Sequence, residues 1–80
     1  MYYVYVLKQK DSEHYYIGYT SDLVRRLKQH KENLTISTKS RKWKLLYYFS
    51  CRDKLVAIKF EKYLKRGSGR AFIIRHFDSN

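Results

Sequence analysis

The chain has 80 residues, with 18 Lys and Arg against seven Asp and Glu, which gives a formal net charge of +11. This length fits a single domain, residues 1–80, and no stretch approaches the roughly 20 consecutive apolar residues that a membrane-spanning helix needs. The basic balance favours a polyanionic partner such as nucleic acid, and the lack of a long basic amphipathic helix weakens the alternative of a membrane-surface protein.

The chain begins with a predicted β-hairpin. Residues 2–7 and 15–19 are rich in aromatic and β-branched side chains, which predicts two strands joined by a polar turn. If the turn centres near residues 10 and 11, Tyr5 lies opposite Tyr16 in an antiparallel pair.

A helix is predicted directly after the hairpin, over about residues 22–31. Thr20 or Ser21 can cap its N-terminus, and an acid in its first turn suits the helix dipole. Leu23 and Leu27 lie four residues apart, so we expect both to face inward.

A third strand is predicted at residues 43–49, after a polar connection. Strict alternation would place four side chains on one face: Trp43, Leu45, Tyr47 and Phe49. Cys51 is the single cysteine of the chain and cannot form an internal disulfide, so we interpret it as a small buried residue at the end of this strand.

Two further helices are predicted in the last third of the chain. The first covers about residues 52–65, with an apolar stripe made of Val56, Ala57, Phe60 and Leu64. Gly67 is expected to end it, and Ser68 to cap a short last helix whose core face carries Ala71, Ile74 and Phe77. The resulting order β-β-α-β-α-α predicts an α/β (α+β) fold with a small three-stranded, largely antiparallel sheet flanked by helices.

Several segments resemble one nuclease family in order and spacing. Tyr3-Val4-Tyr5 and Tyr16-Ile17-Gly18 look like the paired signature that names the GIY-YIG endonucleases. Four further segments are similar to the first helix, third strand, glutamate-bearing helix and tail of that family: 15–30, 43–48, 57–61 and 65–72. The chain resembles a small stand-alone member of this family and is similar to the nuclease domain of the bacterial excision-repair incision subunit.

The chain departs from the pattern of the family at two places. Tyr3 occupies the position of the glycine that gives the family its name, and we interpret that position as structural. Many members also have a supporting asparagine after the glutamate helix. The only candidate here is Asn80, which we do not assign.

The resemblance implies a metal-dependent endonuclease with five catalytic residues. Tyr5 and Tyr16 match the two signature tyrosines, and Arg26 matches the arginine of the first helix. His30 matches the histidine one turn further on, and Glu61 matches the glutamate that binds Mg²⁺ or Mn²⁺ in the family.

Physical chemistry supports these residue types for cleaving a phosphodiester bond. Hydrolysis needs a group that takes a proton from water and positive charge beside the phosphoryl oxygens. A tyrosine with an ordinary pKa of about 10 becomes a plausible base only where cations favour the phenolate. Arg26 and His30 lie four residues apart on one helix face, and one carboxylate such as Glu61 suffices for Mg²⁺ when substrate phosphate completes the site.

Each candidate also has a purely structural interpretation. Tyr5 and Tyr16 suit ordinary strand positions, and Arg26 suits a solvated helix face. His30 suits a helix end, where a cation stabilises the dipole, and Glu61 suits an ion pair with the lysine four residues on.

The basic residues predict contacts with nucleic-acid phosphates, which do not depend on base sequence. Candidates for this role are Lys28, Lys39, Arg41, Lys42, Lys65, Arg66 and Arg70. We expect a protein of the bacterial cytoplasm or nucleoid that cuts DNA, with structured or damaged DNA in repair or recombination as candidate substrates and a protein partner supplying specificity. The alternatives are a basic nucleic-acid-binding module without substantial turnover and a domain whose tyrosines dock a protein.

Overall fold

The computed structural model describes residues 1–9, 14–29 and 43–78. Three strands form one antiparallel sheet in the order β2-β1-β3. The elements are β1 Tyr2–Gln9, β2 Tyr15–Thr20, a helix at residues 23–29, β3 Trp43–Cys51, α2 Lys54–Lys65 and α3 Gly67–Phe77. The predicted order β-β-α-β-α-α and the largely antiparallel three-stranded sheet are therefore confirmed.

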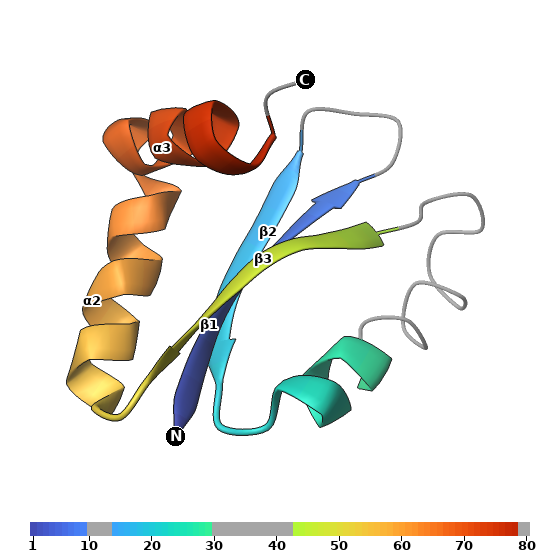
Figure 1. Cartoon of the computed structure of the whole chain (residues 1–80), viewed down its shortest axis with the longest axis vertical. Coiled ribbons are helices and arrows are strands. Elements are labelled where there is room, and N and C mark those ends of the chain that lie inside the picture. The colour runs from blue at the N-terminus through green and yellow to red at the C-terminus, as the bar shows by residue number, and fades with distance from the viewer. Residues whose placement is uncertain (10–13, 30–42, 79–80) are drawn as a thin grey trace.

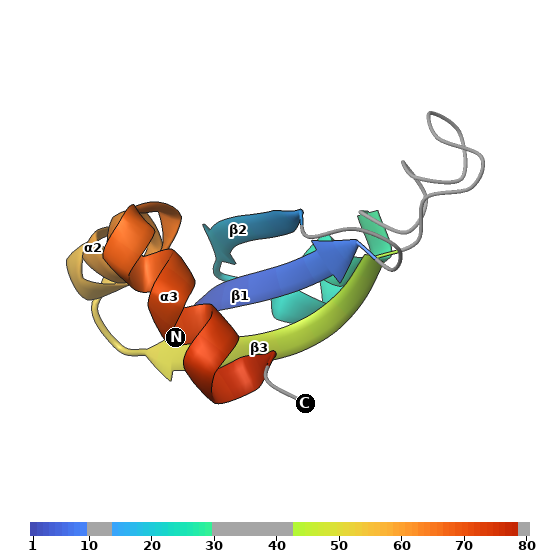
Figure 2. The same cartoon turned by 90° about the horizontal axis from the view of Figure 1, so that it is seen from above.

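The sheet is covered on both faces by helices. Figures 1 and 2 show α2 and α3 on one side and the helix at residues 23–29 on the other. The central strand β1 is consequently buried on both faces, and Val4, Tyr5, Val6 and Leu7 are each at most 3% exposed. Alternation along β1 turns Val4 and Val6 toward α2 and α3. Tyr5 and Leu7 turn toward the opposite face.

The hairpin register differs from the expected one. Tyr5 pairs with Gly18, and Tyr16 pairs with Leu7. The predicted pairing of Tyr5 with Tyr16 is wrong because β1 continues to Gln9, whose backbone N–H donates to the carbonyl of His14 over 3.0 Å. The shift amounts to two residues, an even number, so Tyr5 and Tyr16 still share one face of the sheet.

A β-bulge in β3 divides its side chains differently from strict alternation. Val6 pairs with Tyr47 while Leu7 pairs with Leu45, so Leu46 is the extra residue. The prediction that four residues of β3 share a face is therefore wrong. Trp43 and Leu45 lie on the Tyr5 face of the sheet. Tyr47 and Phe49 lie on the face that α2 and α3 cover, where Tyr47 stacks on Phe77 and Phe49 contacts Phe60.

Aspartates, rather than hydroxyl residues, cap the first two helices. The backbone N–H of Arg25 donates to the carboxylate of Asp22 over 3.1 Å, so the prediction of Thr20 or Ser21 as the cap is wrong. Asp53 caps α2 in the same way, by accepting from the backbone N–H of Leu55 over 2.8 Å.

The α2–α3 connection is tighter than predicted. Arg66 is the only residue between the helices, and Gly67 begins α3 instead of ending α2. No side chain caps α3, so Ser68 does not have its predicted role. A Cβ at Gly69 would lie 2.0 Å from the carbonyl oxygen of Tyr63, which means that this position admits only glycine while the helices stay this close.

This close approach sets the inward face of α3 and corrects the predicted core. Ile73, one turn after Gly69, is fully buried, while Ala71 and Ile74 are exposed. Phe77 is partly buried, as predicted, and Val56 of α2 is 47% exposed and lies outside the core. The core on this face packs Val4 and Val6 against five residues: Cys51, Ala57, Leu64, Ile73 and the partly buried Phe60. Cys51 is buried at the end of β3, as predicted.

Among the described residues, none of the helices is long and apolar enough to cross a membrane.

Candidate functional site

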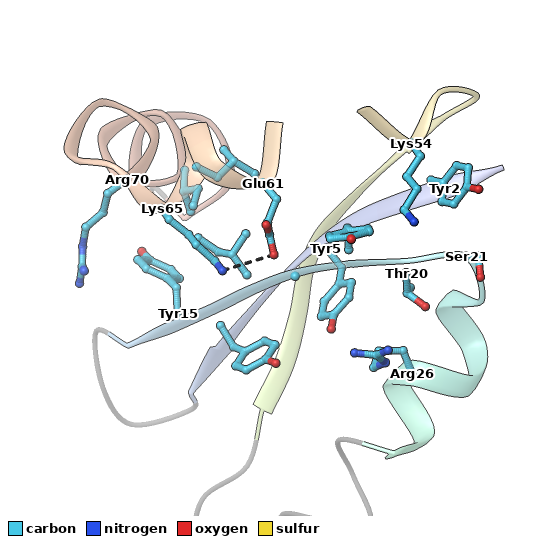
Figure 3. A pocket seen from close by; sticks show the side chains of 16 residues that line it. Tyr2, Tyr5, Tyr15, Thr20, Ser21, Arg26, Lys54, Glu61, Lys65 and Arg70 are labelled. Atoms are coloured by element: carbon cyan, nitrogen blue, oxygen red, sulfur yellow. Dashed lines mark ion pairs between the residues drawn. The ribbon is translucent and has the colours of Figure 1, made fainter. Parts of the chain in front are cut away.

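A pocket of about 740 Å³ runs along β2, the strand at one edge of the sheet. Tyr5 of β1, Tyr16 of β2, Arg26 of the first helix and Glu61 of α2 all line it. Figure 3 shows Tyr5 and Arg26 on one side of the pocket and Glu61 beside Lys65 on the other. Four residues from four different elements, separated by as many as 56 positions in the sequence, thus meet at one place.

Gly18 explains how a buried tyrosine in the central strand reaches this edge pocket. Tyr5 is opposite Gly18, and a Cβ at Gly18 would lie 2.7 Å from the Tyr5 hydroxyl oxygen. The phenol ring therefore lies across the glycine, in the direction of the edge. The rings of Tyr5 and Tyr16 are stacked, with centroids 6.2 Å apart and an interplanar angle of 15°.

The short connection after β2 positions Arg26. Thr20 Oγ1 accepts a hydrogen bond from the backbone N–H of Asp22 over 3.1 Å, which turns the chain out of the sheet. The backbone N–H of Arg26 then donates to the carbonyl of Asp22, which makes Arg26 the first residue to close a helical turn. Its half-buried side chain lies beside Tyr5 and donates a hydrogen bond to it.

The phenol of Tyr5 resists ionisation in this environment. Burial raises its pKa above the ordinary value, and the neighbouring Tyr16 and, more weakly, Glu61 raise it further. The charge and the hydrogen bond of Arg26 lower the pKa but do not cancel the effect of burial. Tyr5 is therefore a neutral phenol at physiological pH in the protein alone.

Glu61 is the only carboxylate that lines the pocket among the described residues. Its side chain is 15% exposed, and its Oε2 lies 3.3 Å from the Nζ of Lys65, which is 54% exposed. The ion pair expected from the structural interpretation therefore exists, and the carboxylate faces the pocket as well. The two interpretations of Glu61 are compatible in geometry.

The donor set fits a hard divalent cation but no densely coordinated metal. No cluster of three His, Cys, Asp or Glu side chains occurs in residues 1–9, 14–29 and 43–78. A single carboxylate suits Mg²⁺ or Mn²⁺, because these ions retain water ligands and also bind substrate oxygens. It does not suit structural zinc, which needs four protein ligands.

The predicted phosphate-binding residues are distributed unevenly. Lys65 and Arg70 line the pocket, and the guanidinium of Arg70 lies 5.4 Å from the ring centroid of Tyr15. Arg66 is exposed between α2 and α3, and Lys28 is exposed on the first helix. The remaining predicted site residues lie outside the described residues: His30, Lys39, Arg41 and Lys42.

One cationic residue of the pocket was not predicted from the sequence. Lys54, the first residue of α2, lines the pocket. It precedes Glu61 by seven residues and Lys65 by eleven, a spacing that places all three on one helix face. That helical spacing is the signal that identifies it.

Tyr3 fits its position despite replacing the glycine of the family signature. It pairs in regular antiparallel register with Thr20 and Ser50, and no described residue, glycine or other, has a positive φ. Its ring lies edge-on to Tyr48, with centroids 6.3 Å apart. The backbone therefore has no need of glycine here.

Comparison with known protein families assigns the chain to one of them. The model of the GIY-YIG catalytic domain matches residues 1–73. The chain belongs to the GIY-YIG family. This family consists of nucleases, so the chain is a nuclease-type domain with a nucleic-acid substrate, and the expected membership is confirmed.

A solved structure supports the assignment of the GIY-YIG fold. The solution NMR structure of a UPF0213 protein from Bacillus halodurans superimposes with a TM-score of 0.58 at 26% sequence identity. The alignment covers 92% of this chain and 82% of that protein. No curated protein matches the chain.

Proposed function

We propose that this GIY-YIG domain is a metal-dependent endonuclease that hydrolyses phosphodiester bonds in DNA. The observation that supports this most is the convergence of Tyr5, Tyr16, Arg26 and Glu61 on one pocket from four elements. An ordinary packing role for each residue does not require that all four line the same pocket.

The side chains of the pocket divide the chemistry between them. Arg26 binds the scissile phosphate and stabilises the charge that develops on its oxygens, because a guanidinium offers several donors in a fixed plane. Tyr16, whose side chain is 42% exposed, orients the phosphate or the attacking water. The Tyr5 phenol first loses its own proton to solvent, and the resulting phenolate, which the adjacent guanidinium favours, accepts a proton from that water.

Glu61 is the proposed ligand for Mg²⁺ or Mn²⁺. When bound, such an ion supplies positive charge to the phosphate and the leaving oxygen. Lys65 neutralises the same carboxylate in the protein alone, over 3.3 Å. The Lys65 side chain is half exposed, and a lysine has a long flexible stem, so it can turn from Glu61 to a DNA phosphate while the carboxylate takes up its ligand.

The biological setting is part of the proposal. We place the protein in the bacterial cytoplasm, acting on structured or damaged DNA in repair or recombination, with a protein partner adding specificity. The basic pocket rim, which includes Lys54, Lys65 and Arg70, would contact the DNA backbone without reading its sequence.

The test is cleavage by Glu61→Gln compared with Asp53→Asn. Both changes replace an acid of the same helical segment with its amide, and Asn caps a helix about as well as Asp. We expect Glu61→Gln to lose metal-dependent nicking by orders of magnitude and to bind DNA as well as the wild type. Asp53→Asn, whose side chain lies outside the pocket, should nick at the wild-type rate.

The assay uses duplex, nicked, flapped, branched and single-stranded DNA with Mg²⁺ or Mn²⁺. Active Glu61→Gln protein would refute the assignment of the metal ligand. If Glu61 is only the partner of Lys65, its loss should cost about 0.2–0.5 kcal/mol of stability and leave nicking intact. A wild type that binds every substrate and cuts none would favour the second candidate function, a nucleic-acid-binding module. The Glu61–Lys65 ion pair is compatible with that function, because such a module needs no metal at Glu61.

A further inference from the structure

Two partly exposed aromatic rings form a corner beside the pocket. Tyr16 is 42% exposed and Trp43 is partly exposed. Their ring centroids are 6.3 Å apart, and the ring planes meet at 73°. Aromatic surface that is grouped beside a concave basic pocket, rather than scattered singly, is typical of a ligand-binding site.

The strand register places this corner on the catalytic face of the sheet. Tyr16 pairs with Leu7 and Trp43 pairs with Gln9. Both of these β1 residues share the face of Tyr5, because they lie two and four positions after it. The bulge at Leu46 is what keeps Trp43 and Leu45 on this side, away from α2 and α3. The corner is therefore continuous with Tyr5, whose ring stacks on Tyr16.

The same face carries further exposed apolar surface along β3. Leu45 is 36% exposed, and Tyr48, which pairs with Tyr5, is 51% exposed. Flat rings and aliphatic surface beside a basic pocket suit a nucleobase attached to a phosphate. A base can stack on one ring of the corner while its edge contacts the other.

We propose that the Tyr16–Trp43 corner binds an unpaired nucleobase of the strand whose phosphate occupies the pocket. This inference rests on the proposed function for its substrate, and it adds the class of that substrate: DNA in which the base beside the scissile phosphate is unstacked, as in a single strand or a flap. Stacking on aromatic side chains tolerates every base, because every base has a π-face. Bases inside a regular duplex are stacked on one another and do not reach such a corner.

Trp43 is the single tryptophan of the chain, which makes the proposal directly measurable. The ligands are a short oligothymidylate strand, a strand of equal length and charge whose central sites are abasic, and a regular duplex. Binding is followed by quenching of Trp43 fluorescence and by anisotropy of a labelled strand, with EDTA present throughout. Because no metal is available for cleavage, this experiment is independent of whether the protein cuts DNA.

The oligothymidylate strand should quench Trp43 strongly, and the abasic strand and the duplex should quench it little at equal occupancy. Trp43→Leu should weaken oligothymidylate binding about tenfold and leave binding of the abasic strand unchanged, whereas Trp43→Phe should retain most of the affinity. The matched control is Tyr63→Leu, which removes a 40% exposed ring of α2 outside the pocket and should change neither affinity.

Equal quenching by the base-bearing and abasic strands would overturn the proposal, because phosphate contacts alone would then explain binding. A Trp43→Leu variant that weakens both strands equally would overturn it as well. Melting curves of each variant separate these outcomes from a loss of folding. Base-dependent quenching in a protein that never cuts DNA would support the base-binding corner and refute the proposed nuclease activity.

Discussion

At the scale of single residues, two features of its surroundings shift the pKa of Tyr5 in opposite directions. It is fully buried in the central strand, and burial raises the pKa of its phenol, with Tyr16 adding to the rise. Arg26 acts in the opposite direction through its charge and its hydrogen bond. The proposed base therefore depends on pH and on the guanidinium beside it.

This balance predicts a cleavage rate that increases with pH. At pH values below the raised pKa of Tyr5, each pH unit makes the phenolate about tenfold more abundant, and the rate should follow. Tyr5→Phe should cut far more slowly and should lose the part of the pH dependence that Tyr5 causes. The measurement is single-turnover nicking between neutral and moderately alkaline pH for both proteins. An identical pH profile in Tyr5→Phe would show that another group controls the rate.

The same shift limits the usable pH range through stability. A folded-state pKa raised above the unfolded value of about 10 means that Tyr5 contributes stability in full below pH 10. That contribution is lost as the pH rises further toward the folded-state pKa. Cleavage should therefore be compared below about pH 10, with a melting curve recorded at each pH.

At the scale of elements, the α2–α3 contact determines where the pocket residues of both helices lie. Gly69 lets the backbone of α3 approach Tyr63 and Leu64 of α2. Ile73, one turn later, reaches the core and also lines the pocket. The position of Arg70 above Tyr15 follows from this approach, because Arg70 is the residue after Gly69.

The two glycines of α3 provide a matched test of this contact. Gly69→Ala should destabilise the fold by about 3 kcal/mol or more, because the added Cβ meets backbone atoms at 2.0 and 2.4 Å that cannot rotate away. Gly67→Ala meets nothing within 4 Å and should be neutral or stabilise the protein by about 0.4–1 kcal/mol. Denaturant unfolding measures both. Equal stability of the two variants would mean that the helices do not pack this closely in solution.

At the scale of the whole molecule, the end of α3 is tied to the hairpin. The carboxylate of Asp78 accepts from the hydroxyl of Tyr15 over 2.5 Å and from the Nζ of Lys8 over 3.1 Å, with a shortest ion-pair distance of 2.8 Å to Lys8. These contacts join residues 63 and 70 positions apart in the sequence. They hold Tyr15 in place beneath Arg70 at the end of the pocket.

This link predicts a component of acid sensitivity. The hydrogen bonds from Lys8 and Tyr15 hold the pKa of Asp78 below its ordinary value of 3.8. The carboxylate therefore contributes stability in full above about pH 4, and this contribution is lost as the pH falls through the lowered pKa. Asp78→Asn should melt several degrees lower than wild type at neutral pH. Loss of the charged contacts should cost on the order of 1 kcal/mol of unfolding free energy, and this corresponds to about 4–8 °C in a domain of this size.

The two melting temperatures should converge on acidification below about pH 4, because wild type then loses what the variant already lacks. Thermal melts across this range measure the effect, and Asp22→Asn serves as the control, because Asn keeps the helix cap. A constant difference between Asp78→Asn and wild type at all pH values would contradict an ionic contribution from Asp78.

Much of this architecture is determined by local sequence alone. The aromatic and β-branched runs define all three strands, and Glu61 and Lys65 share a helix face because they are four residues apart. Burial of Cys51 and the order of the elements follow from the same local patterns. Helical and strand periodicities are properties of the chain itself, so they can be read without knowledge of distant partners.

Only the tertiary structure decided which residues meet. The pairing of Tyr5 with Gly18 depends on how far the hairpin continues, and the extra residue Leu46 exists only relative to the neighbouring strand. The inward face of α3 follows from the contact of Gly69 with α2, which the local sequence does not reveal. Register, bulges and helix contacts arise from competition between distant segments for the same backbone partners and the same core volume. Strand and helix formation could therefore be predicted locally, whereas the assembly of the pocket required the packed molecule.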